Sequence, residues 1–197
     1  FQVKEDIQIP LVGTITATNL TAVETQLEKL LNDGYKRIKI KVGNSIERDI
    51  EKLKLVMDLI GDQIKLRIDA NQGYSYHEAL ELVSILNPEA VELFEQPLKP
   101  QEWEGMKLLS ERSPVPLMLD ESIWTEQDII KASAPQCAHF VKLKLMKHGS
   151  SHRVLDLARK AHGRGFQLIF GNGVQTEVGC FQEAVLFPLL PGQHFAG

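Results

Sequence analysis

The segment Arg37-Ile38-Lys39-Ile40-Lys41-Val42 is the most informative part of the sequence about its architecture. Charged and apolar residues alternate along it, which is typical of a β-strand with one apolar and one polar face. The strands of an open parallel sheet covered by helices on both faces are instead almost uniformly apolar. We therefore expect the charged face of this strand to line a polar interior.

Similar units lie on both sides of this strand, each with an apolar or alternating run followed by a helical pattern of three- and four-residue apolar steps. Strands are expected at residues 11–16, 37–42, 65–71, 91–94, 117–120, 139–145 and 166–170, and residues 194–197 could begin an eighth. Ser/Thr-x-x-Glu capping boxes at Thr21 and Ser75 predict two helix starts, and Ser45 is expected to cap a third helix.

Strands that alternate with helices at this spacing imply right-handed parallel units. Seven to eight such units predict an α/β fold of the (β/α)8 TIM-type barrel class, and a doubly wound open sheet is the alternative. We expect one barrel domain over residues 1–197. Because about 250 residues are typical of such barrels, the eighth unit is expected to be truncated.

Composition narrows the class of partner. The chain has 197 residues, 43% of them apolar, with 22 basic and 26 acidic residues and a formal charge of −4. This balance disfavours a nucleic-acid surface, and no apolar run approaches the roughly 20 residues of a membrane span. The two cysteines, Cys137 and Cys180, lie far apart in the sequence. Their scarcity favours a reducing, cytoplasmic setting. We expect a small-molecule partner.

Three acids occupy matching places near strand ends. Glu95 follows Asp69 by 26 residues, and Asp120 follows Glu95 by 25. In a barrel they converge on one mouth, where three crowded carboxylates repel one another and call for a cation. Oxygen ligands of this type suit Mg²⁺. The alternative is that these acids are solvated or pair with Arg67 and nearby lysines.

Lysines flank the acids along the chain. Lys39 and Lys41 lie two residues apart and share a strand face, so each ammonium should depress the pKa of the other toward a value useful to a base. Lys41, nearer the mouth, is the better base. Lys144 should face it across the barrel, with the acids between them.

Five ordered motifs resemble the barrel domain of the enolase superfamily, in its muconate lactonizing enzyme subgroup. They are Lys39-Ile40-Lys41-Val42-Gly43, Asp69-Ala70-Asn71, Phe94-Glu95-Gln96-Pro97, Asp120-Glu121-Ser122 and Leu143-Lys144-Leu145-Met146-Lys147. Members of this family bind a carboxylate substrate on Mg²⁺, remove the proton next to the carboxylate and stabilise the resulting enediolate on the metal.

The resemblance implies a role for each site residue. Asp69, Glu95 and Asp120 would be ligands of Mg²⁺ or Mn²⁺, and Lys41 and Lys144 the catalytic acid/base pair. Substrate-binding residues would be Lys39, Asn71 and Asn172. The expected reaction is racemisation or epimerisation of an acyl-amino acid or dipeptide by a homo-oligomer.

Several alternatives stay open at this stage. The reaction could be β-elimination of the o-succinylbenzoate synthase kind or cycloisomerisation, and a non-catalytic metal- or carboxylate-binding barrel is an alternative of another class. Residues 171–173 could bind an anion, although a plain turn is favoured. Lys142 stands where relatives often place an amide, and its partner is open. The capping domain that carries specificity in the family is expected to lie outside residues 1–197.

Overall fold

The computed structural model describes residues 8–171, 176–192 and 194–197. Its strands are β1 (Gly13–Ile15), β2 (Arg37–Lys41), β3 (Lys65–Asp69), β4 (Val91–Glu95), β5 (Leu117–Leu119), β6 (Phe140–Leu143), β7 (Gln167–Phe170) and β8 (His194–Ala196). Its helices are α1 (Leu20–Asn32), α2 (Ile46–Leu59), α3 (Tyr76–Val83), α4 (Trp103–Arg112), α5 (Glu126–Ser133), α6 (Leu145–His148), α7 (Ser151–His162), α8 (Glu177–Leu186) and the 3-10 helix η1 (Phe187–Leu189).

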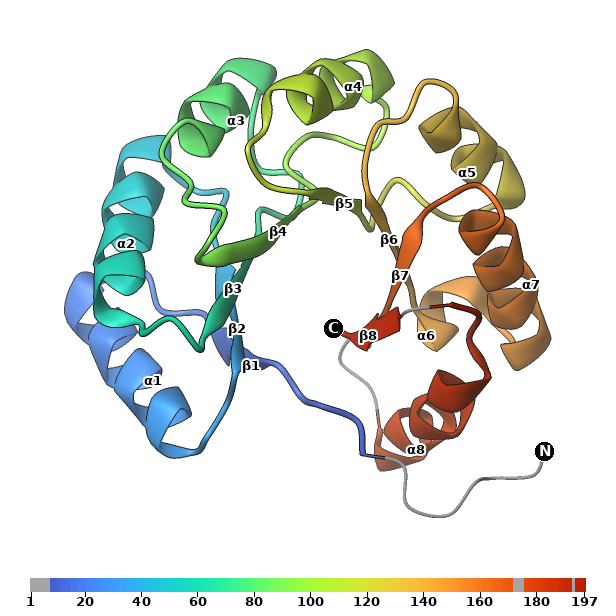
Figure 1. Ribbon diagram of the computed structural model, residues 1–197, viewed down its shortest axis with the longest axis horizontal. Helices are drawn as coiled ribbons and strands as arrows, with labels where there is room; N and C mark the ends of the chain where they lie inside the picture. The colour runs from blue at the N-terminus through green and yellow to red at the C-terminus, as the bar shows by residue number, and fades with distance from the viewer. Residues whose placement is uncertain (1–7, 172–175, 193) are drawn as a thin grey trace.

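The strands form one parallel sheet in which each strand pairs with the next in chain order. Figure 1 shows this sheet as a curled inner layer with the helices arranged around its outside. Chain order rules out the doubly wound alternative, in which the order of strands reverses at a switch point. The predicted succession of parallel strand–helix units is confirmed, and residues 194–196 do form an eighth strand.

Side chains tie β8 to the first half of the sheet. Within the described residues, no backbone pairing joins β8 to β1. Arg67 of β3 donates a hydrogen bond to the backbone oxygen of Ala196, and its guanidinium lies 6.0 Å from the centroid of the Phe195 ring. The Arg37 guanidinium lies 5.5 Å from the same centroid. The structure therefore shows a curled eight-stranded sheet of TIM-type topology.

Apolar side chains form two clusters, one on each side of the sheet. The larger lies between strands and helices, and the smaller consists of Leu93, Met118, Phe140 and Ile169, with Phe195 packed against it. Residues two apart in a strand share a face. Glu95, Asp120 and Lys142 follow members of the smaller cluster by two positions and so share its face of the sheet. The smaller cluster is therefore an apolar layer next to these polar residues.

Local sequence determines where the helices begin. The capping box at Ser75 is confirmed, because its side chain accepts from the backbone N–H of Glu78 and the Glu78 carboxylate accepts from that of Ser75. The box predicted at Thr21 is wrong. Asn19 caps α1 instead by accepting from the backbone N–H of Ala22. No helix in the described ranges is long and apolar enough to cross a bilayer.

The sixth strand is shorter than predicted. β6 ends at Leu143, and Leu145 begins α6, with Lys144 as the residue before the helix. Gly149 ends this helix with a φ of 85°, a backbone conformation that glycine adopts without steric cost. The prediction that Leu145 continues the strand is wrong, because its apolar side chain packs against the core from a helical turn.

Candidate active site

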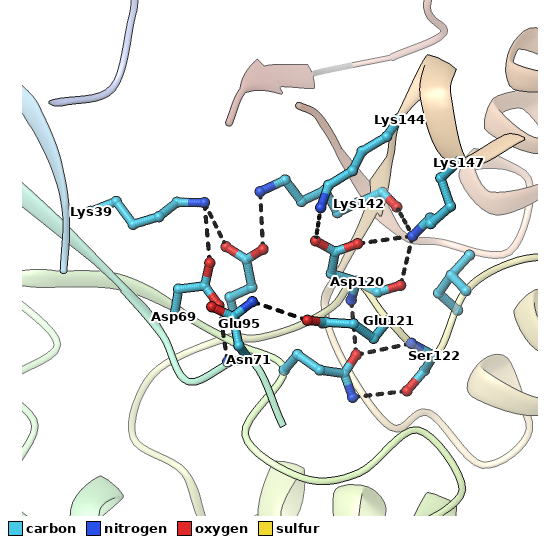
Figure 2. A network of polar contacts seen from close by, with 12 residues as sticks. Lys39, Asp69, Asn71, Glu95, Asp120, Glu121, Ser122, Lys142, Lys144 and Lys147 are labelled. Carbon is cyan, nitrogen blue, oxygen red and sulfur yellow. Dashed lines mark hydrogen bonds and ion pairs between the residues drawn. The ribbon is translucent and has the colours of Figure 1, made fainter. Parts of the chain in front are cut away.

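Three buried carboxylates lie at one edge of the sheet. Asp69 ends β3, Glu95 ends β4 and Asp120 directly follows β5. Asp69 and Glu95 are in register as neighbours in the sheet. Each acid is at most 1% exposed, and Figure 2 shows all three within a single polar network. The structure thus brings the three predicted acids to the carboxyl ends of neighbouring strands.

Each carboxylate forms an ion pair with a lysine singled out in the sequence. The nitrogen–oxygen distances are 2.7 Å for Lys41 and Asp69, 2.9 Å for Lys39 and Glu95, and 2.5 Å for Lys144 and Asp120. The premise that these acids lack counter-charge without a metal is therefore wrong. Their partner is not Arg67, whose guanidinium lies 2.6 Å from Glu92.

Two further lysines contact the same acids, Lys142 from β6 and Lys147 from α6. Lys142 Nζ lies 3.0 Å from Glu95 Oε1. Lys147 Nζ lies 2.9 Å from Asp120 Oδ1 and donates to the Asp120 backbone oxygen at 2.7 Å. The Lys142 side chain is 2% exposed and that of Lys147 is 7% exposed, and both belong to the network of Figure 2. The open question about Lys142 is thus answered in favour of pairing with an acid.

The ion pairs shift the pKa values of the buried groups. Burial by itself raises the pKa of Glu95, but Lys142 and Lys39 outweigh it and hold that pKa well below its usual range. Burial lowers the pKa of Lys39, yet Glu95 and Asp69 outweigh it and the net shift is upward. The predicted depression of the Lys39 pKa is wrong, because two acids act on this ammonium. At Lys142, burial prevails and the pKa is lowered.

Gln96 fixes the distance between the ends of β4 and β5. This fully buried side chain accepts through Oε1 from the backbone N–H groups of Asp120 and Ser122, at 3.0 and 3.1 Å. Its Nε2 donates to Ser122 Oγ at 2.9 Å and to the Leu98 backbone oxygen at 2.8 Å. Gln96 was not predicted as a site residue. A polar amide directly after the buried Glu95 was the one available signal.

Asn71 bridges a lysine and an acid at the mouth. Its Oδ1 accepts from Lys41 Nζ at 2.6 Å, and its Nδ2 donates to Glu121 Oε1 at 3.0 Å. Its φ of 43° is uncommon for a residue with a side chain, and such strain gathers at functional sites. Glu121 was not predicted as a site residue. Asn172 lies outside the described residues.

A buried network holds the backbone that follows Lys41. Lys52 Nζ donates to the Lys41 backbone oxygen at 2.6 Å and lies 2.9 Å from Asp49 Oδ1. Asp49 Oδ2 accepts from the Tyr74 hydroxyl at 2.8 Å and from the backbone N–H groups of the loop before α2. Ser45, predicted to cap α2, makes no side-chain cap bond. Asp49 Oδ2 instead accepts from the Ser45 backbone N–H at 3.4 Å.

A cavity of about 660 Å³ opens beside Lys39 and Lys41. Its walls come from β1, β7, β8 and α8, and they include Thr14 and Phe187. None of the three acids lines it. The cavity therefore gives a small molecule access to the lysines of β2 from the side where the sheet begins and ends.

The donor set suits a divalent cation in its chemistry. Asp69, Glu95 and Asp120 offer carboxylate oxygens, the ligands that Mg²⁺ prefers. Asp120 Oδ2 is buried and makes no hydrogen bond of good geometry, although Lys144 Nζ is close to it. In the described part of the chain, no three acidic, histidine or cysteine side chains stand ready as a ligand group. Lysine ammonium groups hold the carboxylate oxygens instead.

Comparison with known proteins shows what this arrangement resembles. The L-Ala-D/L-Glu epimerase of Clostridium acetobutylicum is 34% identical over 147 residues, or 74% of this chain and 41% of that protein. The hydrophobic dipeptide epimerase of Enterococcus faecalis is 31% identical over 163 residues, or 83% of this chain and 44% of that protein. The chain thus spans less than half the length of these relatives.

Solved structures agree with the sequence relatives. The dipeptide epimerase of Cytophaga hutchinsonii, complexed with Mg and the dipeptide D-Ala-L-Val, superimposes with a TM-score of 0.90 at 25% identity over 98% of this chain and 53% of that one. Muconate cycloisomerase of Pseudomonas fluorescens gives 0.86 at 27% identity over 94% and 52%. The family model described as Enolase C-terminal domain-like matches residues 22–196. The chain therefore belongs to the enolase superfamily, in its muconate lactonizing enzyme-like subgroup.

Proposed function

We propose that this chain forms the catalytic barrel of a Mg²⁺-dependent isomerase that epimerises a dipeptide or racemises an acyl-amino acid. The observation that carries the proposal is the position of two lysines around the row of acids on β3, β4 and β5. Lys41 lies on β2, on one side of that row, and Lys144 follows β6 on the other. The dipeptide epimerases among the relatives support this choice of reaction.

The metal ligands in this proposal are Asp69, Glu95 and Asp120, with Mg²⁺ or Mn²⁺ as the cation. A divalent cation bound to their oxygens would replace lysine ammonium groups and offset the negative charge that develops on the substrate carboxylate as its neighbouring proton leaves. The burial of all three acids favours this chemistry, since electrostatic stabilisation is strongest where water is excluded.

The two lysines divide the proton transfer. One of them, as a neutral amine, takes the proton from the α-carbon, and the other, as an ammonium, delivers a proton to the opposite face. The electron pair left by the broken C–H bond forms the new one, so the configuration inverts without any other change in the substrate. Lys39, Asn71 and Asn172 are proposed to bind the substrate.

Proton exchange with solvent tests the function directly. The protein is incubated with Mg²⁺ in D₂O and a panel of dipeptides and N-acyl-amino acids of both configurations, and loss of the α-proton signal is followed by NMR. Lys41→Ala and Lys144→Ala should each abolish exchange from one configuration only, because each lysine serves one face. Exposed Lys54 lies on α2, and Lys54→Ala should leave the exchange unchanged.

Two outcomes would contradict the proposal. If no acid in the panel exchanges its α-proton with Mg²⁺ present, the proposed epimerisation or racemisation is wrong. If exchange survives both lysine substitutions together, the base lies elsewhere. Cycloisomerisation is the second candidate function, favoured by the likeness to muconate cycloisomerase. It predicts turnover of a cis,cis-diene dicarboxylate to a lactone and no exchange with dipeptides.

A further inference from the structure

Ammonium groups outnumber carboxylates around the three acids, and Figure 2 shows four of these lysines with the acids. Asp69, Glu95 and Asp120 are contacted by five ammonium groups, those of Lys39, Lys41, Lys142, Lys144 and Lys147. With every group ionised, these eight residues sum to +2, and Glu121, which Asn71 links to Lys41, reduces the total to +1. A divalent cation would enter a site that already has an excess of positive charge.

Lys142 has the least exposed side chain of these five lysines. It is 2% exposed, and within the described residues Glu95 is its one acid in ion-pair range. Two glycines make room for its stem. A Cβ at Gly171 would lie 2.4 Å from Lys142 Cε, and one at Gly197 would lie 3.4 Å from it. Any side chain at Gly171 would displace the lysine.

Both oxygens of Glu95 are already paired with a lysine. Lys142 holds Oε1 at 3.0 Å and Lys39 holds Oε2 at 2.9 Å, and the carboxylate is fully buried. A cation that takes Oε1 would leave the Lys142 ammonium without its acid in a buried place, and an uncompensated buried charge is costly. The metal and Lys142 therefore compete for the same oxygen.

We propose that Lys142 is an internal cation that competes with a divalent metal for Glu95 and thereby weakens the affinity of the site for the metal. This inference rests on the proposed function, in which Glu95 is a metal ligand. A unit charge several ångströms from a divalent ion changes its affinity about tenfold even at the dielectric constant of water. Removing the Lys142 charge should therefore tighten Mg²⁺ binding at least about tenfold.

Calorimetric titration of Mg²⁺ tests the inference without measuring activity, and the Mg²⁺-dependent rise in melting temperature provides a second readout. The variants are Lys142→Met, which removes the charge and the hydrogen bond, and Lys142→Gln, which keeps a donor for Glu95. Lys107→Met is the control. Lys107 lies on α4, pairs only loosely with Glu104 at 3.7 Å, and its loss changes the net charge by the same amount.

The expected result is a Kd for Mg²⁺ at least about tenfold lower in Lys142→Met and Lys142→Gln, with Lys107→Met within twofold of the unmodified protein. Metal binding that appears only in the two Lys142 variants would support the inference more strongly. If the unmodified protein binds Mg²⁺ and neither Lys142 variant binds it more tightly, the inference is overturned while the proposed function stands. If no form binds Mg²⁺, both fail.

Discussion

Replacing Lys52 by methionine tests whether a buried ion pair on α2 supports the strand that carries Lys41. Lys52 is 3% exposed and Asp49 is 2% exposed. The Lys52 ammonium has two partners, the Asp49 carboxylate at 2.9 Å and the Lys41 backbone oxygen at 2.6 Å. Methionine fills a similar volume but cannot donate, so the variant leaves Asp49 and the Lys41 carbonyl short of a partner.

Removing one member of a buried ion pair costs about 3–5 kcal/mol. Asp49 keeps its hydrogen bonds from the Tyr74 hydroxyl and the loop backbone, which places the expected loss near the lower end, about 3 kcal/mol. Urea unfolding followed by circular dichroism at pH 7 measures it. Lys54→Met, an exposed change on the same helix, should stay within about 0.5 kcal/mol of the unmodified protein.

The pH dependence gives an independent check. Burial by itself raises the pKa of Asp49, but hydrogen bonds from Lys52 and Tyr74 outweigh it, and the net shift is downward. A carboxyl whose pKa is lowered on folding stabilises the protein above its unfolded pKa of about 3.9, and this contribution disappears as the pH falls through the folded value. The difference between Lys52→Met and the unmodified protein should therefore be largest at pH 7 and shrink below about pH 4. Equal stability of Lys52→Met and Lys54→Met at pH 7 would refute this account.

Three further changes test other parts of the fold. Gly43→Ala should destabilise by more than 1 kcal/mol, because φ at Gly43 is 99° and the new Cβ would lie 2.3 Å from the Ala70 backbone oxygen. Ser75→Ala should lower the free energy of unfolding by about 1 kcal/mol through loss of the capping box. Glu92→Gln should destabilise most at pH 7 and less as the pH falls through the lowered pKa of Glu92, since Arg67 holds that pKa down against burial and the stabilisation is lost in acid.

Each of these changes is measured by urea unfolding and has its own contrary result. A stable Gly43→Ala would mean that the loop after β2 can move away from Ala70. An unchanged Ser75→Ala would show that solvent satisfies the first turn of α3 equally well. For Glu92→Gln, a loss of stability that is the same at pH 3 and pH 7 would mean that the carboxylate charge is not what stabilises this position.

The periodicity of apolar residues and the helix-capping residues predicted most of the architecture. Alternation along β2 and the capping box at Ser75 are local signals, and local signals survive in the folded chain. The errors have local causes too. Asn19 and Thr21, two residues apart, are both able to cap a helix, and Asn19 is the N-cap while Thr21 lies in the first turn of α1. The alternation of β6 continues past its last paired residue, so the period alone could not show that Leu145 turns into a helix.

The sequence predicted where the site lies better than it predicted which lysine pairs with which acid. Strand ends gave the place of the three acids, because in parallel strands the carboxyl ends meet at one edge. Which ammonium contacts which oxygen depends on rotamers and on distances across the barrel. The spacing of residues in the sequence predicts neither the rotamers nor these distances. This is why the sequence left Lys142 without a partner and gave Lys39 the wrong direction of pKa shift.

The buried amide of Gln96 separates the placement of the acids from the placement of the lysines. All four of its hydrogen bonds run to its own strand end or to the segment that carries Asp120, and none runs to a lysine. The spacing between Glu95 and Asp120 is therefore settled when the barrel folds, before any ligand arrives. Lys39 and Lys142 come from β2 and β6 and take no part in the Gln96 hydrogen bonds. A substitution of Lys39 or Lys142 should therefore change the charge around the acids while the Gln96 hydrogen bonds keep Glu95 and Asp120 in place.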